Sequence, residues 1–200
     1  MSRGVFVSVD GPNGAGKSTF IKQLSEKLSD ALPVFLTREP TETDFGRFVK
    51  KNEQNMRGLR YAQLIWADRY FHVNNYILPE LKSGKVVISD RYIESSIVLQ
   101  GFDGVSIEEI WDLNGGFIIP DLSVILSAEP AILESRLSER DSRSNFELKM
   151  KREQELEGYK KAVNFLSSKG FQHVVYKNNT SDDLYNNIDD VYNRILSIAG

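Results

Sequence analysis

The sequence predicts an α/β fold in which helices cover both faces of a parallel sheet. Short apolar segments rich in β-branched residues alternate along the chain with longer segments whose apolar residues recur at helical spacing. Of the 200 residues, 40% are hydrophobic and 26% are charged, as in ordinary globular proteins. We find no internal repeat and no Gly/Ser/Pro-rich linker, so we expect one domain spanning residues 1–200.

Five segments are candidate strands, because each is short, apolar and followed by polar or turn-forming residues. They are residues 5–9, 34–37, 86–89, 122–126 and 173–176. In a parallel sheet, ligands bind beyond the carboxyl ends of the strands. We therefore expect the polar residues that follow Val9, Leu36, Ser89 and Leu126 to share one crevice.

Helical periodicity occupies the longer intervals between these strands. The helical segments are residues 19–28, 61–81, 130–137, 156–166 and 184–198. Gly84 is a stop signal after the second of them, and Pro130 suits the first turn of the third. Ser181 is placed to cap the last helix. The charged residues 153–157 are expected to form an ordinary solvent-exposed helical face.

The composition excludes several classes of function. The chain has no cysteine, which removes Cys-based zinc sites, iron–sulfur clusters, disulfides and thiol catalysis. With 28 acidic and 25 basic residues the net charge is −3, so we expect no nucleic-acid partner. No apolar run approaches the ~18 residues of a membrane span, and the first residues lack the features of a signal peptide. We expect a cytoplasmic protein that does not bind membranes.

A phosphate-binding motif lies between the first strand and the first helix. The pattern G-x-x-x-x-G-K-[ST] is matched by Gly11-Pro12-Asn13-Gly14-Ala15-Gly16-Lys17-Ser18, with Thr19 next in the helix. Glycines let successive backbone N–H groups point at a phosphate, and the helix start adds its positive dipole end. Lys17 is expected to reach the β- and γ-phosphates as a catalytic cation, and Ser18 to bind Mg²⁺. This loop predicts ATP binding with Mg²⁺ as cofactor.

Four further motifs follow in a characteristic order. They are Thr37-Arg38-Glu39-Pro40, Ala67-Asp68-Arg69, the segment from Asp90-Arg91-Tyr92 to Gln100-Gly101, and Pro120-Asp121-Leu122. Together with the phosphate loop they resemble the thymidylate kinase family, especially its bacterial members, over nearly the whole chain. We find no LSGGQ-like signature of transporter-type ATPases. The resemblance implies a three-layer P-loop NTPase fold with a five-stranded parallel sheet. It also implies transfer of the ATP γ-phosphoryl group to a nucleoside monophosphate, with dTMP as the favoured acceptor and dTDP as the product.

The chemistry of this transfer agrees with the pattern of arginines. A phosphate acceptor is already anionic at neutral pH, so no general base has to activate it. Catalysis must instead bring two polyanions together and neutralise charge on the transferring group. Arginines arriving from separate strand ends suit this task, because their planar forks bind phosphate oxygens bidentately. Arg38 and Arg91 follow two different strands and are placed for it.

The resemblance assigns further roles by position. Arg91 and Arg38 would bind the acceptor phosphate, with Lys50 or, less well placed, Arg47 beside them. Asp90 would hold the Mg²⁺ shell through water. The base would receive hydrogen bonds from Arg69, Ser96 and Gln100.

A third group of arginines lies near residues 138–147, a segment that resembles the family's mobile lid over ATP. Positions 12–15 of the phosphate loop hold no basic residue, whereas this region holds Arg136, Arg140 and Arg143. Family members without a basic loop residue usually carry lid arginines instead, so Arg140 and Arg143 are expected to act in catalysis. The alternative is a charged helix end held by i,i+4 pairs.

Three residues depart from the family pattern around the acceptor. Asn13 stands where the family usually has Asp or Glu near the sugar 3′-hydroxyl, Ile65 where a Phe usually stacks on the thymine, and Leu99 where bacterial members usually have Tyr. The transfer machinery is intact while the base-and-sugar pocket is altered. Another or a modified nucleoside monophosphate therefore stays open as the acceptor, as does a non-catalytic nucleotide-binding protein. Family members commonly pair through helices beside the sheet, so a homodimer is expected.

Overall fold

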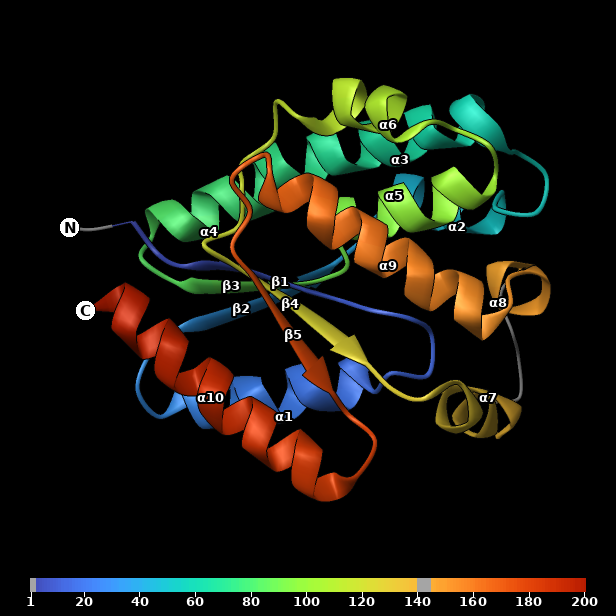
Figure 1. Cartoon of the computed structure of the whole chain (residues 1–200). Coiled ribbons are helices and arrows are strands. Elements are labelled where there is room, and N and C mark those ends of the chain that lie inside the picture. Colours follow the sequence, from blue (N-terminus) through green and yellow to red (C-terminus); the bar gives the residue numbers. More distant parts are fainter. Residues whose placement is uncertain (1–2, 140–144) are drawn as a thin grey trace.

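The structure, a computed structural model, describes residues 3–139 and 145–200 and contains one parallel sheet of five strands (Figure 1). The strands are β1 (Phe6–Asp10), β2 (Val34–Arg38), β3 (Val86–Asp90), β4 (Leu122–Ser127) and β5 (His173–Lys177). Their order in the sheet is β2-β3-β1-β4-β5, so β1 lies at the centre. Each strand lies within a residue of its predicted position, and the predicted fold class is confirmed.

The register brings the carboxyl ends of the inner strands together. Asp90 at the end of β3 pairs with Val9 of β1 on one side and with Arg38 of β2 on the other. Asp10 at the end of β1 pairs with Ile125 of β4. The residues that follow these strands therefore emerge at one edge of the sheet, where the sequence predicts the crevice.

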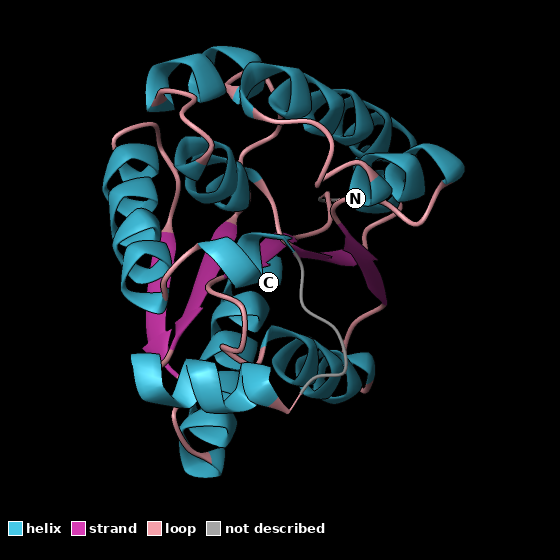
Figure 2. Cartoon of the chain, turned by 90° about the vertical axis from the view of Figure 1, so that its right-hand side faces the viewer, coloured by secondary structure: helices cyan, strands magenta, loops and turns pink. Residues whose placement is uncertain are grey.

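Two layers of helices enclose the sheet (Figure 1 and, from the side, Figure 2). One face is covered by α1 (Lys17–Ser29) and α10 (Ser181–Ala199), which contact each other. The other face is covered by helices that include α3 (Gly58–His72), α5 (Ile93–Phe102) and α9 (Arg152–Ser167). The remaining helices are α2 (Asp44–Lys51), α4 (Leu78–Lys82), α6 (Ile107–Asn114), α7 (Pro130–Ser138) and α8 (Asn145–Lys149).

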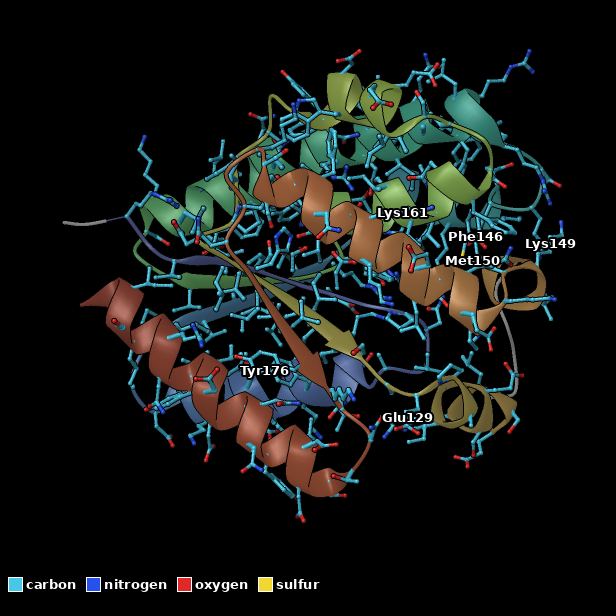
Figure 3. The ribbon with its side chains drawn as sticks, in the orientation of Figure 1. Glu129, Phe146, Lys149, Met150, Lys161 and Tyr176 are labelled. Atoms are coloured by element: carbon cyan, nitrogen blue, oxygen red, sulfur yellow. The ribbon has the colours of Figure 1, made fainter. Side chains whose placement is uncertain are left out.

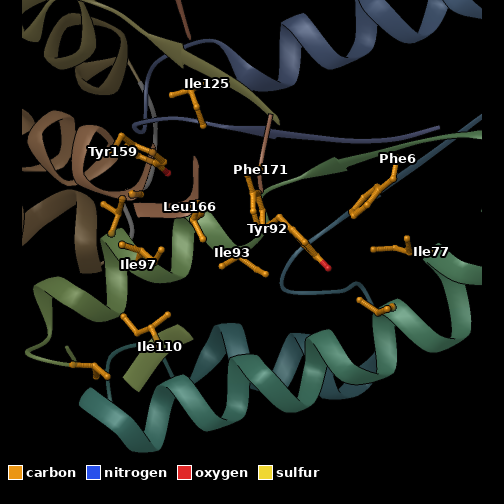
Figure 4. Packing of buried hydrophobic residues seen from close by; sticks show 14 of the residues in the cluster. Phe6, Ile77, Tyr92, Ile93, Ile97, Ile110, Ile125, Tyr159, Leu166 and Phe171 are labelled. Carbon is orange, nitrogen blue, oxygen red and sulfur yellow. The ribbon is translucent and has the colours of Figure 1, made fainter. Parts of the chain in front are cut away.

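Alternate residues of the strands pack into two separate hydrophobic cores, one on each face of the sheet. Phe6 of β1 and Ile125 of β4 face the α5–α9 layer, where they pack with Ile93 and Leu166 (Figure 4). Val7 of β1 belongs to the core beneath α1 and α10. Successive side chains of a strand point to opposite faces, so a strand covered on both faces is apolar throughout. This explains the continuous apolar runs in the sequence.

The helix predicted over residues 61–81 is divided by a π-helical turn, η1 (Val73–Ile77), between α3 and α4. Pro79 follows this turn and cannot donate a backbone hydrogen bond to the preceding turn. The side-chain amides of Asn74 and Asn75 donate to the carbonyls of Tyr70 and Phe71, at 2.7 and 2.8 Å. The missing N–H of Pro79 and the two side-chain amides explain why this helical stretch is not α-helical throughout.

Thr180, rather than the predicted Ser181, caps α10. Its Oγ1 accepts from the backbone N–H of Asp183 at 3.1 Å, and Asp183 Oδ2 accepts from the backbone N–H of Thr180 at 3.0 Å. This is a reciprocal capping box, which satisfies two backbone donors at once. Ser181 is the first helical residue. Within the described ranges, we find no helix with the length and apolar character needed to cross a membrane.

Candidate active site

The phosphate loop connects β1 to α1 and is packed closely against its surroundings. Gly11 (φ 139°) and Gly16 (φ 90°) have backbone conformations that favour glycine. A Cβ at Gly11 would collide with the carbonyl oxygen of Leu126, and one at Gly16 would lie 2.6 Å from Nδ2 of Asn178. That same Asn178 amide donates to the carbonyl of Ala15 at 2.7 Å. Both glycines are therefore needed for the loop to fit against β4 and the turn after β5.

Lys17 is the first residue of α1 and is buried. Its Nζ donates to the carbonyls of Gly11 and Pro12 at 2.7 and 3.0 Å, so the ammonium lies inside the loop. Burial, followed by the nearby Arg91, lowers the pKa of Lys17 to about 8, against the opposing effect of the carboxylates. The buried positive charge of Lys17 therefore destabilises the empty site, and a bound anion would offset this effect.

A cleft of about 480 Å³ opens beside the loop at the carboxyl edge of the sheet. It is lined by residues from the loop, the strand ends, α2, α3 and α5. Those predicted from the sequence are Asn13, Gly14, Gly16, Lys17, Ser18, Thr19, Arg38, Lys50, Ile65, Asp90, Arg91, Leu99 and Gln100. Those that were not assigned a role in the site from the sequence are Glu39, Pro40, Glu53, Tyr61 and Phe146. Phe146 comes from α8, beside the start of α9 (Figure 3).

The inner end of the cleft continues into a small pocket of about 40 Å³. Arg69 and Ser96 line it together with Ile65, Leu99 and Gln100. The Oε1 atom of Gln100 is buried and has no hydrogen-bond partner among the described residues. An unpaired buried acceptor is costly, so it indicates a place where a ligand can donate a hydrogen bond.

Arg69 is almost completely buried, with 1% of its surface exposed, and is held on several sides. Its Nε donates to Glu39 at 2.8 Å, and its Nη2 donates to the carbonyl of Tyr92 at 3.1 Å and to Ser96 Oγ at 3.0 Å. Its Nη1 donates to Asn114 Oδ1. The guanidinium is therefore rigid at the wall of the inner pocket.

Arg91 follows β3 in a left-handed conformation, with φ 76°. Such a conformation costs a side-chain-bearing residue about 1–3 kcal/mol and persists only where the surroundings hold it. Here Arg91 N–H donates to the carbonyl of Val9 at 3.0 Å, and its own carbonyl accepts from Ser89 Oγ at 2.8 Å. The guanidinium donates to Ser95 Oγ at 2.9 Å and to Asn13 Oδ1 at 2.6 Å. The strained backbone thus aims the side chain at the phosphate loop.

The other predicted cations are more exposed. Arg38 lines the cleft from the end of β2, with Nη1 3.3 Å from Glu42 Oε1. Lys50 lines it from α2. Arg47, on the same helix, instead contacts Asp44 and donates to the carbonyl of Glu42. Of the two α2 candidates, Lys50 is therefore the one at the cleft.

Ser18 and Asp90 line the same cleft, and their oxygens suit a hard cation. The Oδ1 atom of Asp90 is buried without a hydrogen-bond partner in the described part of the chain. Within that part, we find no cluster of three or more His, Asp or Glu residues that could hold a metal. Mg²⁺ bound to nucleotides usually keeps several waters and takes only one or two protein ligands. This donor set fits a magnesium ion that arrives with a nucleotide.

Two of the predicted lid arginines, Arg140 and Arg143, lie outside the described residues. Arg136, on α7, connects three segments. Its Nη1 donates to the carbonyls of Gly14 at 3.2 Å and Asn178 at 2.9 Å, and its Nη2 donates to the carbonyl of Asn179 at 3.0 Å. The phosphate loop and the turn after β5 are therefore joined by this guanidinium.

Asp10, which was not predicted from the sequence, lies beneath the site and binds the residues that follow β3. Its carboxylate accepts from Tyr92 N–H at 2.8 Å and from Ser95 Oγ. Burial first, and the neighbouring Glu94 next, raise the pKa of Asp10 to about 7. Its signal in the sequence is an acidic residue at the carboxyl end of an apolar strand, directly before the loop.

Glu155 was predicted to lie on an exposed face, and this was wrong. It is 1% exposed, and its carboxylate accepts from Asn13 and Arg152. The available signal was Tyr159, which is buried one helical turn later on the same face of α9. A carboxylate can occupy this face because donors from two segments satisfy it.

The fold and the cleft define a P-loop phosphotransferase, in which a glycine-rich loop at a helix start faces arginines from other strand ends. The family model described as "Thymidylate kinase" matches residues 9–188. The chain is 38% identical over 148 residues to a "Probable thymidylate kinase" of Caldivirga maquilingensis, covering 72% of each chain. It is 36% identical over 150 residues to a "Thymidylate kinase" of Bacillus velezensis, covering 70% of this chain and 71% of that one. The chain belongs to the thymidylate kinase family.

A solved structure supports the fold. The crystal structure of thymidylate kinase from Ehrlichia chaffeensis superposes with a TM-score of 0.70 at 24% identity, covering 99% of this chain and 100% of that one. The predicted family and the predicted class of enzyme, a nucleoside monophosphate kinase that uses ATP, are both confirmed.

Proposed function

We propose that the cleft described above transfers the γ-phosphoryl group of Mg·ATP to dTMP, with the predicted residues in the predicted roles. The observation that carries the proposal is the common position of Lys17, Arg38 and Arg91 around one cleft that continues into a small pocket beside Arg69. A dTMP phosphate oxygen attacks the γ-phosphorus, and the bond from that phosphorus to the β,γ-bridging oxygen breaks. The products are dTDP and ADP.

On the donor side, residues 11–19 surround the ATP phosphates, which accept hydrogen bonds from backbone N–H groups of the loop beyond Asn13. Lys17 neutralises charge between the β- and γ-groups. Ser18 and, through water, Asp90 hold Mg²⁺. When bound, the ion supplies charge neutralisation at the β- and γ-phosphates. The same proposal includes Arg140 and Arg143 as cations at the transferring group.

On the acceptor side, Arg91, Arg38 and Lys50 bind the dTMP phosphate. Arg91 suits this role because its guanidinium is partly buried and is oriented by Ser95 and Asn13 before substrate arrives, so little reorganisation accompanies binding. Asn13 lies beside it at the sugar.

The base lies in the cleft at the mouth of the inner pocket, against Ile65 and Leu99, which line both. The unpaired Gln100 Oε1 accepts the N3–H of thymine, while Arg69 and Ser96 border the opposite wall. Aliphatic walls discriminate between bases less strongly than an aromatic stack.

A panel of nucleoside monophosphates in an ADP-release assay tests this function. The enzyme should prefer dTMP over dUMP, dCMP, dGMP and UMP in kcat/KM. Equal rates, or a preference for another monophosphate, would establish the altered-acceptor alternative that Ile65 and Leu99 suggest. ATP binding without turnover on any acceptor would indicate a nucleotide-binding protein that lacks transfer activity.

Residues 1–200 act in this proposal as one kinase domain in the cytoplasm, and two copies form a homodimer. Support for pairing comes from large apolar residues exposed along α3, η1 and α4. They are Leu59, Tyr70, Phe71, Tyr76 and Leu78. Tyr70, 56% exposed, stacks on the half-buried Trp66. Sedimentation analysis should give a dimer for the wild-type chain and a monomer for Tyr70→Glu.

A further inference from the structure

Glu155 connects α9 to the phosphate loop through two hydrogen bonds. Its Oε1 accepts from the backbone N–H of Asn13 at 2.9 Å and from the side-chain Nδ2 of Asn13 at 3.1 Å. Its Oε2 accepts from Arg152 Nη1 at 2.7 Å. All of these contacts are buried, and Glu155 and Asn13 are 142 residues apart in the chain. Both oxygens of the Glu155 carboxylate therefore accept hydrogen bonds, which hold the side chain in one position.

The same Asn13 side chain also binds Arg91. Its Oδ1 accepts from Arg91 Nη2 at 2.6 Å. Asn13 therefore lies between a carboxylate, which can only accept, and a guanidinium, which can only donate. An amide with its nitrogen toward Glu155 and its oxygen toward Arg91 satisfies both neighbours. The chemistry of the two neighbours thus determines the orientation of the Asn13 amide.

We infer that Glu155 is a positioning residue for phosphoryl transfer: it orients the Asn13 amide, which in turn holds the Arg91 guanidinium at the phosphate loop. This inference rests on the proposed role of Arg91 at the acceptor phosphate. Without the carboxylate, the amide can rotate and Arg91 keeps only its contact with Ser95 in the described network. Preorganisation of this cation matters because a catalytic charge that must first be ordered stabilises the transition state less.

The arrangement predicts a specific incompatibility. Asn13→Asp puts a second carboxylate against Glu155 and removes the side-chain donor at position 13, so that only the backbone N–H of this residue still donates to Glu155. Like charges at hydrogen-bond distance in a buried site repel strongly. We expect this variant to lose about 10- to 100-fold in kcat, with a smaller change in KM for ATP.

Glu155→Gln should repair that loss. The Gln side-chain nitrogen can donate to the new carboxylate at position 13, whose other oxygen still accepts from Arg91. The double variant Asn13→Asp/Glu155→Gln should therefore recover at least about tenfold in kcat over Asn13→Asp alone, which is a coupling no pair of independent sites gives. Glu155→Gln alone should lower kcat less than Asn13→Asp does, because its oxygen can still accept from Asn13. The loss of the counter-charge to the buried Arg152 should lower its unfolding midpoint.

The experiment is a four-protein cycle of wild type, both single variants and the double variant, with kcat and KM for ATP and dTMP and an unfolding midpoint for each. Glu157→Gln, an exposed carboxylate on the same helix, is the matched control and should match wild type. If Glu155 only stabilised the packing of α9, activity would follow the unfolding midpoint. In that case the double variant would be worse than either single one, and this result overturns the inference.

Wild-type turnover of dTMP is measured first, because its absence counts against the proposed function and not against the network. The positioning role is then read from crystal structures of the same proteins. Asn13→Asp alone should break the contact between residue 13 and the Arg91 guanidinium, and the double variant should restore it. An unmoved Arg91 in Asn13→Asp overturns the inference.

Discussion

Arg69 and Glu39 form a buried ion pair at the wall of the inner pocket, with Arg69 Nη2 2.7 Å from Glu39 Oε2. Glu39 follows β2 and Arg69 lies on α3, so the pair joins the edge of the sheet to a helix that lines the inner pocket. The other oxygen of Glu39 lies 3.0 Å from Nδ1 of His72, whose Nε2 is 2.6 Å from Thr37 Oγ1. The inner pocket is therefore supported by a continuous polar network.

This pair predicts a stability effect. Glu39→Gln leaves the buried Arg69 without its counter-charge and should reduce the free energy of unfolding by about 3 kcal/mol at pH 7. Urea denaturation measures it. Glu42→Gln, an exposed carboxylate three residues later, is the control and should change the free energy of unfolding little.

The difference should also depend on pH. Burial by itself would raise the pKa of Glu39, but Arg69 and then His72 outweigh it and hold the pKa below its ordinary 4.5. A depressed folded-state pKa means that the stabilisation is complete above about pH 4.5 and is lost as the pH falls through the folded-state value. The difference in free energy of unfolding between wild type and Glu39→Gln should therefore become smaller below pH 4.5. A gap that stays constant down to pH 3 would contradict this.

Arg91→Ala tests the acceptor-phosphate assignment. Loss of a preorganised charge at the transferring group should lower kcat by about 10²- to 10³-fold. Arg47→Ala is the matched control, since that guanidinium is bound to Asp44 and the Glu42 carbonyl and should be dispensable. Steady-state kinetics measures kcat for both variants, and thermal unfolding shows whether either variant has lost its fold. Near-native turnover of the Arg91 variant would remove this residue from the mechanism.

Ile65→Phe and Leu99→Tyr should each strengthen dTMP binding. An aromatic ring against the base adds about 0.5–1.5 kcal/mol, which corresponds to a KM for dTMP about 2- to 10-fold lower. Leu59→Phe, on the exposed face of the same α3 helix, controls for adding a ring elsewhere. The measurement is kcat/KM for dTMP relative to dUMP and dCMP. Unchanged selectivity in both variants would show that these two walls do not contact the base.

Asp90→Asn should raise the Mg²⁺ concentration needed for half-maximal activity. The buried Oδ1 atom is unpaired in the described residues, and in the proposed mechanism its charge would help to hold the ion's water shell. A titration of activity with Mg²⁺ at fixed ATP gives the value, and EDTA should abolish turnover of the wild-type enzyme. An unaltered Mg²⁺ requirement in the variant would place the ion elsewhere.

Local and contiguous features of the chain were enough to predict the sheet, the phosphate loop and the convergence of Arg38, Asp90 and Arg91 on one edge. The periodicity of apolar residues indicates which face of each strand or helix is buried. The phosphate-loop motif consists of adjacent residues and needs no tertiary information. Parallel strands bring their carboxyl ends together whatever the details of packing, so the cleft followed from the strand positions alone. Ile65, Leu99 and Gln100 lie on helices, and they were assigned to the site from the motifs that resemble the thymidylate kinase family.

Only the tertiary structure decided which polar side chains meet. Formal charge alone does not distinguish Glu155 from the exposed Glu157, because both are acidic residues of α9. What separates them is whether a partner from a distant segment is within hydrogen-bond distance, as Asn13 is for Glu155. Burial of a charge depends on that partner, since an unsatisfied carboxylate would be expelled to water. The sequence thus determined where the site is, and long-range packing determined how its charges are held.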